Sequence, residues 1–391
     1  MTAAPADRNR ELARIHCLAK ELGLAREEYE DVLFTQARVR SAGDLDHAGR
    51  RKVIEHLAAR VSSHGEWAFI ARAAQDRQTC ALQDPRMPRV DANGIELEYD
   101  TFGRRSARPL VLVMGLGAQM ILWDEEFCET LAARDFFVVR FDNRDVGLST
   151  KFDHAGMPDV FRAVQKAATN QPVDAPYTLG DMADDTVYLM AALDIERAHV
   201  VGASMGGMIA QTLAIRHPER LLTMTSIMST TGNPEVPPAT PEALRVLLTP
   251  VPSEREAYLE RSLRTWRVIG SPGFPFDEER VLARAARSFD RAFHPAGVAR
   301  QLVAIIASGN RKRALRSVTT PTLVIHGDAD PLARVEGGRD TADAVPGAEL
   351  LIIEGMGHDL PRGAWVRIID AIDAHASRVQ PRAGAPRERS A

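Results

Sequence analysis

The sequence lacks the features of secreted, membrane and zinc-binding proteins. It has only three cysteines among 391 residues, Cys17, Cys80 and Cys128, and they are widely spaced. This number and spacing show no disulfide framework or zinc pattern and favour a reducing compartment. No apolar run reaches the roughly 18 residues of a membrane span, and the N-terminus shows no basic stretch followed by an apolar one. We therefore expect a cytoplasmic protein without a membrane partner.

The sequence also lacks an excess of positive charge, with 49 Lys and Arg residues against 53 Asp and Glu residues. The formal net charge is −4, which argues against nucleic acid as a partner of the whole chain. Hydrophobic residues make up 45% and charged residues 26%, as in a globular enzyme with enough apolar surface for a core and more than one domain. We see no internal repeat.

The pentapeptide 202–206 has the pattern Gly-x-Ser-x-Gly. It follows the predicted strand 198–201 and leads into a helix-like segment at 208–214. A nucleophile elbow needs this strand-to-helix context, because the tight turn holds the serine in a strained conformation above the sheet. Ser204 is therefore the candidate nucleophile.

A serine nucleophile needs a base and a carboxylate that orients the base. The apolar run 322–325 precedes an acidic turn with Asp328 and Asp330, and the run 350–353 precedes a glycine-rich loop with His358. Both clusters follow predicted strands, and the sites of open α/β sheets form at that edge. The residues alone leave both carboxylates as candidates.

These segments, together with residues 114–117 and 140–150, resemble the α/β-hydrolase superfamily. The resemblance covers residues 88–377 and is closest to the aclacinomycin methylesterase-like group of small-ester hydrolases. It implies an α/β protein with the α/β-hydrolase fold, in which a mostly parallel central sheet is flanked by helices.

The resemblance also implies roles for single residues. Ser204 corresponds to the nucleophile, His358 to the base and Asp330 to the orienting acid. Asp330 is favoured over Asp328 because the acid of the family usually falls just before Pro-Leu or a similar pair at the far end of the loop. Asp359 is expected to be a loop or cap residue.

Two backbone N–H groups are expected to form the oxyanion hole. One belongs to Met205, which follows the nucleophile. The other, by resemblance, belongs to Leu116 in the loop after the third strand. Many relatives have His-Gly in that loop where this chain has Met114-Gly115, which removes a polar side chain but no backbone donor.

The chain divides into parts of different character. A hairpin signal at 90–99 opens the predicted hydrolase core. The predicted parts are an N-terminal helical domain (1–80), a linker (81–89), the core (90–231 and 311–377), a helical lid inserted into it (232–310) and a disordered basic tail (378–391).

The N-terminal segment is additional to a minimal hydrolase. Residues 9–60 resemble the phage regulatory protein GemA family. No nucleophile or metal cluster is visible there, and the basic residues Arg50, Arg51 and Lys52 are interspersed with acidic ones, as on a solvated helix face. We expect the helices to pack on the hydrolase body or to form a homo-oligomer.

Several aromatic residues are candidates for the wall of a substrate pocket. Burial within the lid is the plainer reading of each of them, but as a set they favour an apolar substrate. The candidates in the lid are Tyr258, Trp266, Phe274, Phe276, Phe289 and Phe293, and Trp123 follows the oxyanion loop.

The sequence therefore predicts a serine carboxylesterase that hydrolyses small to medium apolar esters through an acyl-enzyme, without metal or cofactor. A serine rather than an aspartate at the elbow argues against haloalkane dehalogenase and epoxide hydrolase chemistry, which by family resemblance needs a carboxylate there. Two alternatives remain open. The same triad serves lactone or thioester hydrolysis or perhydrolysis, and a degenerate hydrolase body would suit a regulatory or interaction protein.

Overall fold

The chain divides into two compact units, Met1–Asp84 and Pro85–Ala391. A computed structural model describes residues 88–380 and a set of positions between residues 15 and 57. The described positions of the first unit include a small buried apolar cluster, which comprises Ile15, Ala19, Val32, Leu33, Val53 and Leu57. Most of the segment that resembles GemA, the predicted linker up to residue 87 and the tail from residue 381 lie outside the described residues.

The second unit is built on one sheet of eight strands in the order β1-β2-β4-β3-β5-β6-β7-β8. The strands β1 and β2 are antiparallel to their neighbours, and all other pairs are parallel. The strands are β1 (Arg89–Ala92), β2 (Ile95–Phe102), β3 (Arg108–Val113), β4 (Phe136–Phe141), β5 (Ala198–Ala203), β6 (Leu221–Ile227), β7 (Thr322–Gly327) and β8 (Glu349–Ile353).

The hairpin predicted at 90–99 is confirmed as β1 and β2. Its two-residue turn is Asn93-Gly94, and both residues have positive φ, 52° and 76°. Asn-Gly is the pair that such a turn favours, because its backbone twist matches that of the paired strands.

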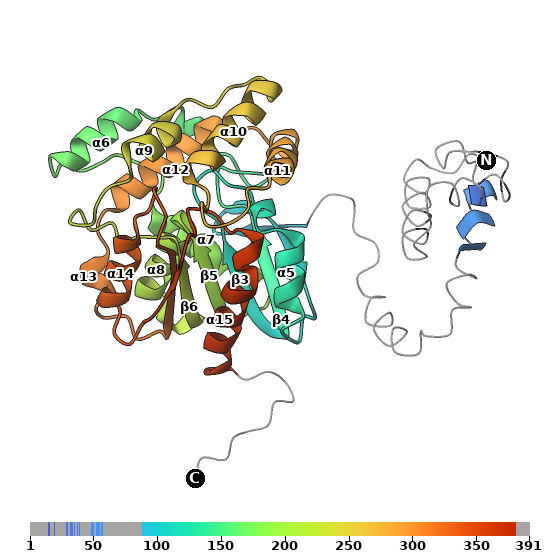
Figure 1. Ribbon diagram of the computed structural model, residues 1–391. Coiled ribbons are helices and arrows are strands. Elements are labelled where there is room, and N and C mark those ends of the chain that lie inside the picture. Colours follow the sequence, from blue (N-terminus) through green and yellow to red (C-terminus); the bar gives the residue numbers. More distant parts are fainter. Residues whose placement is uncertain are drawn as a thin grey trace, which may run out of the picture. The chain divides into compact units, whose positions relative to one another are not determined.

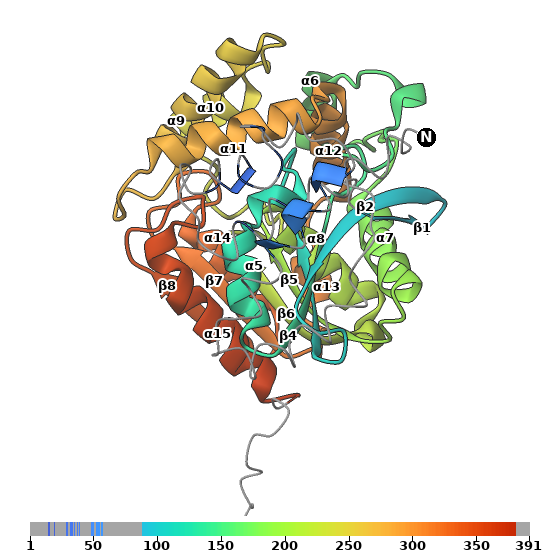
Figure 2. The same cartoon turned by 90° about the vertical axis from the view of Figure 1, so that its right-hand side faces the viewer.

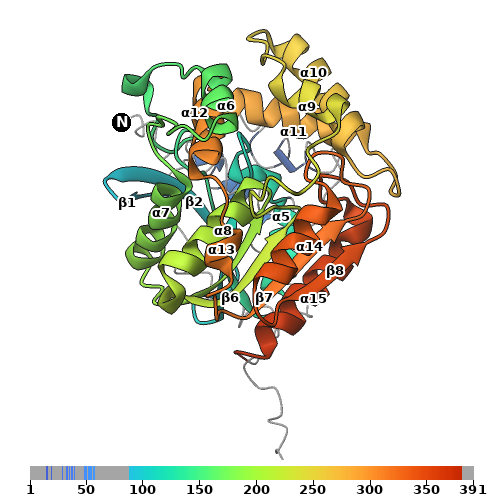
Figure 3. The same cartoon turned by 90° about the vertical axis from the view of Figure 1, so that its left-hand side faces the viewer.

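Helices cover both faces of the sheet, as the predicted fold requires. Helices α5 (Glu125–Ala132) and α15 (Trp365–Ser377) lie on one face (Figure 2). Helices α7 (Leu179–Ala192), α8 (Met205–Arg216) and α14 (Val335–Ala344) lie on the other (Figure 3). Every residue of β4, β5 and β7 is buried, which explains why parallel strands read as continuous apolar runs.

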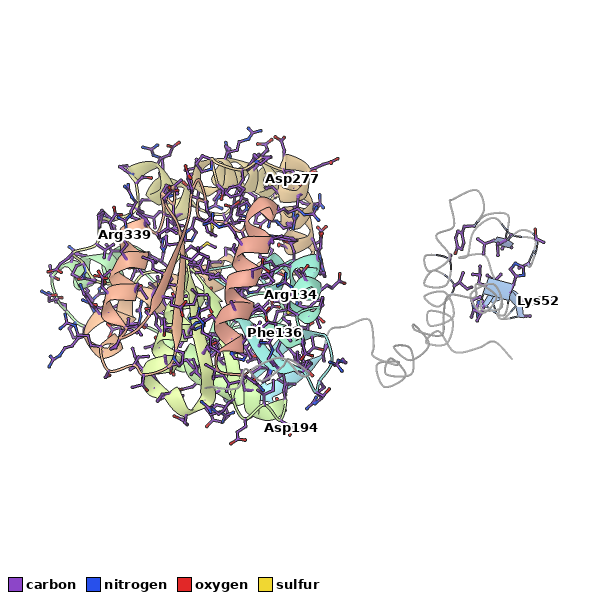
Figure 4. All side chains as sticks on the ribbon, turned by 60° about the horizontal axis from the view of Figure 1, so that its bottom comes forward. Lys52, Arg134, Phe136, Asp194, Asp277 and Arg339 are labelled. Atoms are coloured by element: carbon purple, nitrogen blue, oxygen red, sulfur yellow. The ribbon has the colours of Figure 1, made fainter. Side chains whose placement is uncertain are left out.

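A layer of further helices lies above the carboxyl edge of the sheet (Figure 1). Most of them belong to residues 232–310, which we call the insert. Figure 4 labels Asp277, which belongs to the insert and directly precedes α11, and Asp194, which precedes β5 and lies at the opposite end of the unit. These helices are α6 (Val160–Ala168), α9 (Pro241–Leu248), α10 (Arg255–Ile269), α11 (Glu278–Arg291) and α12 (Pro295–Ser308). The short α13 (Lys312–Leu315) lies instead beside α8 and α14 (Figure 3).

Ion pairs join α11 of the insert to the body. Arg280 lies 2.7 Å from Asp124, and Arg287 lies 2.7 Å from Glu125. Burial raises the pKa of Glu125, but hydrogen bonds from Arg287 and Arg140 outweigh it and hold that pKa at about 2. The carboxylate therefore stays charged at neutral pH and keeps its attraction to α11.

In the part of the chain that the structure describes, no helix is both long and apolar enough to cross a membrane.

Candidate active site

Ser204 occupies the turn between β5 and α8. Its backbone has φ 55° and ψ −119°, a conformation that non-glycine residues rarely adopt. The flanking glycines make the turn possible. A Cβ atom on Gly202 would lie 2.0 Å from the Gly206 carbonyl oxygen, and one on Gly206 would lie 2.0 Å from that of Val113. Since a residue with a Cβ atom would clash with the backbone at either position, steric contact explains why both flanking residues are glycine.

Two hydrogen bonds hold the strained serine in place. The Ser204 N–H donates to the Ile227 carbonyl at 2.9 Å. The Ser229 hydroxyl donates to the Ser204 carbonyl at 2.8 Å. Both partners come from β6 and the residues just after it, so the neighbouring strand fixes the elbow.

The loop after β8 brings His358 to Ser204. The His358 Nε2 atom lies 3.0 Å from the Ser204 hydroxyl oxygen, and its Nδ1 atom lies 2.7 Å from Asp330 Oδ2. The imidazole is only 7% exposed. Because a carboxylate accepts the Nδ1 proton, Nε2 is left free to accept the proton of the serine hydroxyl.

The structure separates the two candidate acids after β7. Asp330 is buried, and its Oδ1 atom accepts the N–H groups of Leu332 at 2.8 Å and Ala333 at 2.9 Å. Asp328 is exposed and accepts the Gly355 N–H at 2.7 Å. Of the two carboxylates, Asp330 is therefore the one in contact with His358.

A second histidine, His326, lies next to the Asp330 carboxylate. His326 Nε2 donates to the Ala333 carbonyl at 2.6 Å and lies 3.7 Å from Asp330 Oδ2. Burial lowers the pKa of His326, so the ring is neutral at neutral pH. It supports the loop that orients Asp330 without adding charge to the site.

The two predicted oxyanion donors lie on either side of Ser204. Met205 is the first residue of α8, so its N–H has no intrahelical acceptor. Leu116 follows Gly115, on which a Cβ atom would lie only 3.6 Å from the Ser204 hydroxyl oxygen. Among the described residues, no acceptor takes the N–H of Leu116 or Met205. Both N–H groups are therefore available to a ligand.

Trp123 does not lie where a pocket wall was expected. Its side chain has no exposed surface, and its ring stacks on Phe127 at 5.7 Å between centroids. Both residues belong to the core between the sheet and the helices α5 and α15. The tryptophan packs inward because α5 begins directly after it and carries Phe127 on its buried face.

The six aromatic candidates of the insert do not form one wall. Tyr258, Phe289 and Phe293 pack on one another with centroids 5.0–6.1 Å apart, and so join α10 to α11. Phe276 is 44% exposed. The Trp266 ring lies 5.5 Å from the Arg284 guanidinium, and Phe274 packs on the body beside Gly363. Their contact with a substrate stays a prediction.

The insert also reaches the histidine loop, a contact that sequence reasoning missed. The His358 N–H donates to the Ile269 carbonyl at 2.6 Å, and the Gly357 N–H donates to the Ser271 hydroxyl oxygen at 2.8 Å. The Ser271 hydroxyl in turn donates to Asp359. Burial raises the pKa of Asp359, and the Ser271 hydrogen bond opposes that rise. Nothing in the sequence signals these contacts, because the partners are more than 80 residues apart.

Within the described residues, no group of three or more His, Cys, Asp and Glu side chains is arranged to hold a metal ion. The expectation that the reaction needs no metal or cofactor stays a prediction.

Comparison with known proteins agrees with this geometry. A model of the family with the alpha/beta hydrolase fold matches residues 108–361. The chain belongs to the α/β-hydrolase family. This agrees with the resemblance found in the sequence, and the matched residues include the strands from β3 to β8, the turn at Ser204 and the loops after β7 and β8.

Several individual members of the family are similar to this chain. The chain is 32% identical to rhodomycin D methylesterase DauP of Streptomyces sp. (strain C5), over 73% of this chain and 96% of that protein. It is 31% identical to rhodomycin D methylesterase DnrP of Streptomyces peucetius, over 72% of this chain and 95% of that protein. The crystal structure of the enol-lactonase from Burkholderia xenovorans LB400 is 25% identical and covers 75% of this chain and 99% of its own, with a TM-score of 0.53.

Proposed function

We propose that this α/β-hydrolase cleaves apolar carboxylic esters of small to medium size through an acyl-enzyme on Ser204. The observation that carries the proposal is the continuous set of hydrogen bonds from Ser204 through His358 to Asp330, with distances of 3.0 and 2.7 Å. These side chains come from three separate loops at one edge of the sheet.

The reaction class rests on the relatives. The chain is an enzyme of the carboxylic ester hydrolase class, since it belongs to the α/β-hydrolases and is more than 30% identical to two methylesterases over most of their length. We extend this class to esters of small alcohols, methyl esters among them. The free N–H groups of Leu116 and Met205 beside Ser204 support acyl transfer as the chemistry.

Each residue then has a defined task. His358 Nε2 takes the hydroxyl proton as Ser204 Oγ attacks the ester carbonyl carbon, and the N–H groups of Met205 and Leu116 stabilise the oxyanion. His358 gives the proton to the departing alcohol. Water attacks the acyl-enzyme by the same route and releases the acid and the serine.

Ser204→Ala tests the proposal. We expect kcat on p-nitrophenyl acetate to fall by a factor on the order of 10⁴ or more, with an unchanged melting temperature. Ser317→Ala, which removes a hydroxyl that donates to the Ala314 carbonyl between α13 and β7, is the matched control and should keep most of the activity. Full turnover by Ser204→Ala would refute the assignment.

A substrate series then defines the specificity. We expect turnover of p-nitrophenyl esters to vary with acyl length, and Ser204 to be labelled by a fluorophosphonate probe. Wild-type protein that turns over lactones or thioesters faster than esters would move the proposal to that alternative. Protein that neither turns over esters nor reacts with the probe would instead indicate a degenerate hydrolase body with an interaction role.

A further inference from the structure

The loop that carries Leu116 has little support of its own. We call residues 114–119, between β3 and the 3-10 helix η3 (Met120–Leu122), the oxyanion loop. Its one internal backbone hydrogen bond among the described residues runs from the Ala118 N–H to the Gly115 carbonyl at 3.2 Å. The loop is held instead by side chains from other segments. Asn143, in the loop after β4, donates to the Met114 carbonyl at 2.9 Å.

The amide of Gln301 bridges the oxyanion loop and the loop after β4. It belongs to α12 of the insert and has no exposed surface. Its Oε1 atom accepts the Gly117 N–H at 2.8 Å, and its Nε2 atom donates to the Arg144 carbonyl at 2.7 Å. Both halves of this buried amide are thus satisfied by backbone groups of loops beside the site.

A second residue of α12 packs against Gly117 of the oxyanion loop. Val298, one turn before Gln301, lies so close to Gly117 that a Cβ atom there would be 2.9 Å from its methyl carbons. Gly117 has φ +65°, a conformation that suits glycine. Gly117 is therefore fixed by a hydrogen bond and by packing, both from the insert.

The far end of the loop is tied to α11. Gln119 donates to the carbonyls of Ser288 at 2.7 Å and Ala292 at 2.9 Å. Arg291 donates to Gln119 Oε1 at 2.8 Å and to Asp142 Oδ2 at 2.6 Å. The insert thus holds the oxyanion loop at two points.

We propose that Gln301 is a positioning residue of the oxyanion hole, through which the insert aims the Leu116 N–H at the reacting carbonyl oxygen. The inference rests on the proposed function, since it takes Leu116 as an oxyanion donor. The Gly117 N–H belongs to the peptide group that directly follows the one carrying the Leu116 N–H, and the two groups share the Leu116 Cα atom. Release of the Gly117 N–H therefore frees the backbone at Leu116 to rotate and move its own N–H away from the oxyanion. A donor serves the oxyanion only at about 2.7–3.1 Å, and a displacement of about 1 Å is enough to lose most of the benefit.

The test replaces Gln301 by methionine, which has a similar length but forms neither hydrogen bond. We expect kcat on p-nitrophenyl acetate to fall about 10- to 100-fold, less than or close to the loss caused by removal of a whole oxyanion donor. Phenylboronic acid, which forms a tetrahedral adduct with a reactive serine, should bind more weakly by the same factor. Benzoate, which is planar and forms no adduct, should bind as it does to the wild type.

Gln211→Met is the matched control. Gln211, on α8, is also a fully buried amide with two side-chain partners. They are Arg311 Nε at 3.2 Å and Ser226 Oγ at 3.3 Å, neither of which belongs to the oxyanion loop. Gln211→Met should lower the melting temperature as Gln301→Met does. It should leave kcat within about threefold of the wild type, since only Gln301→Met disturbs an oxyanion donor. If Gln301→Met does not fold, Gln301→Asn withdraws the amide by one methylene group and should give a smaller loss of the same kind.

The possible failures are distinguishable. Equal losses of kcat in the Gln301 and Gln211 variants, or a Gln301 variant that keeps wild-type kcat and affinity for phenylboronic acid, overturn the inference and leave the proposed function standing. Wild-type protein without esterase activity and without inhibition by phenylboronic acid overturns the proposed function itself.

Discussion

The Asp330→Asn variant tests how the histidine is oriented. The substitution exchanges one carboxylate oxygen for an amide NH₂ group. The hydrogen-bond partners of Oδ1 and Oδ2 decide which of the two oxygens is replaced. Asp330 Oδ1 accepts two backbone N–H groups, from Leu332 at 2.8 Å and Ala333 at 2.9 Å, and these still need an oxygen. The NH₂ group therefore takes the place of Oδ2, 2.7 Å from His358 Nδ1.

This orientation disables the base. A donor that faces Nδ1 stabilises the tautomer with the proton on Nε2, and His358 then cannot accept the proton of Ser204. The corresponding change in trypsin lowers kcat about 10⁴-fold, which equals about 5.5 kcal/mol in the activation free energy. The reverse orientation would leave two buried N–H groups without an acceptor, at about 1–3 kcal/mol each. We therefore expect a loss on the order of 10⁴ in kcat.

Asp328→Asn is the matched substitution two residues away. Asp328 Oδ1 accepts the Gly355 N–H at 2.7 Å, and an amide oxygen can do the same. We expect kcat within about threefold of the wild type, because the geometry of His358 is unchanged. Initial rates on p-nitrophenyl acetate and melting temperatures of both variants decide the matter. A larger loss in Asp328→Asn, or small losses in both, would refute the reasoning.

Three further predictions concern stability and domain organisation. Burial lowers the pKa of His199 to about 3, while an unfolded imidazole titrates near about 6.5. Between these values the unfolded state binds the extra proton, so the free energy of unfolding decreases as the pH falls, by about 1.4 kcal/mol per unit for this group. Urea unfolding of His199→Asn at pH 5 and pH 6 should lose this part of the slope, and an unchanged slope contradicts the assignment. Trp123→Ala should cost about 3–5 kcal/mol in urea unfolding, whereas a pocket wall would raise KM at unchanged stability. A chain without residues 1–84 should keep its kcat, because the sheet and the apolar cores on its two faces, which support the site, all lie in the second unit. Sedimentation of the same protein tests whether the first unit makes an oligomer, and loss of ester turnover would contradict the prediction.

Local signals in the sequence were sufficient for most of the sheet. The strands expected at 198–201, 322–325 and 350–353 are confirmed as β5, β7 and β8, and the helix expected at 208–214 is confirmed as part of α8. Buried parallel strands must be apolar along their whole length, so each leaves a continuous pattern that needs no knowledge of its partners. The Asn93-Gly94 turn is equally local, since its backbone conformation depends on those two residues.

The expected pocket shows where local signals stop. Tryptophan and phenylalanine are suited both to a pocket wall and to a core, and the sequence around Trp123 is compatible with either. The outcome depended on Phe127 and Trp365, which lie against the same face of the sheet. The second of these is more than 240 residues away, so no pattern around Trp123 could indicate it.

The sequence by itself indicated the elbow with Ser204 and the two loops proposed to carry the acid and the base, and its resemblance to the α/β-hydrolases indicated the fold. The elbow and the strands before these loops could be recognised locally because they depend on steric or periodic constraints among neighbouring residues, such as the glycines at 202 and 206. The resemblance favoured Asp330 over Asp328, but only the tertiary structure shows that Asp330 contacts His358, since this depends on which side chain the turn after β7 directs inward. The tertiary structure alone also shows that the insert holds the histidine loop, through Ile269 and Ser271, and the proposed oxyanion loop, through Gln301. Those hydrogen bonds join groups far apart in the chain, and a hydrogen bond forms only where folding brings donor and acceptor within about 3 Å.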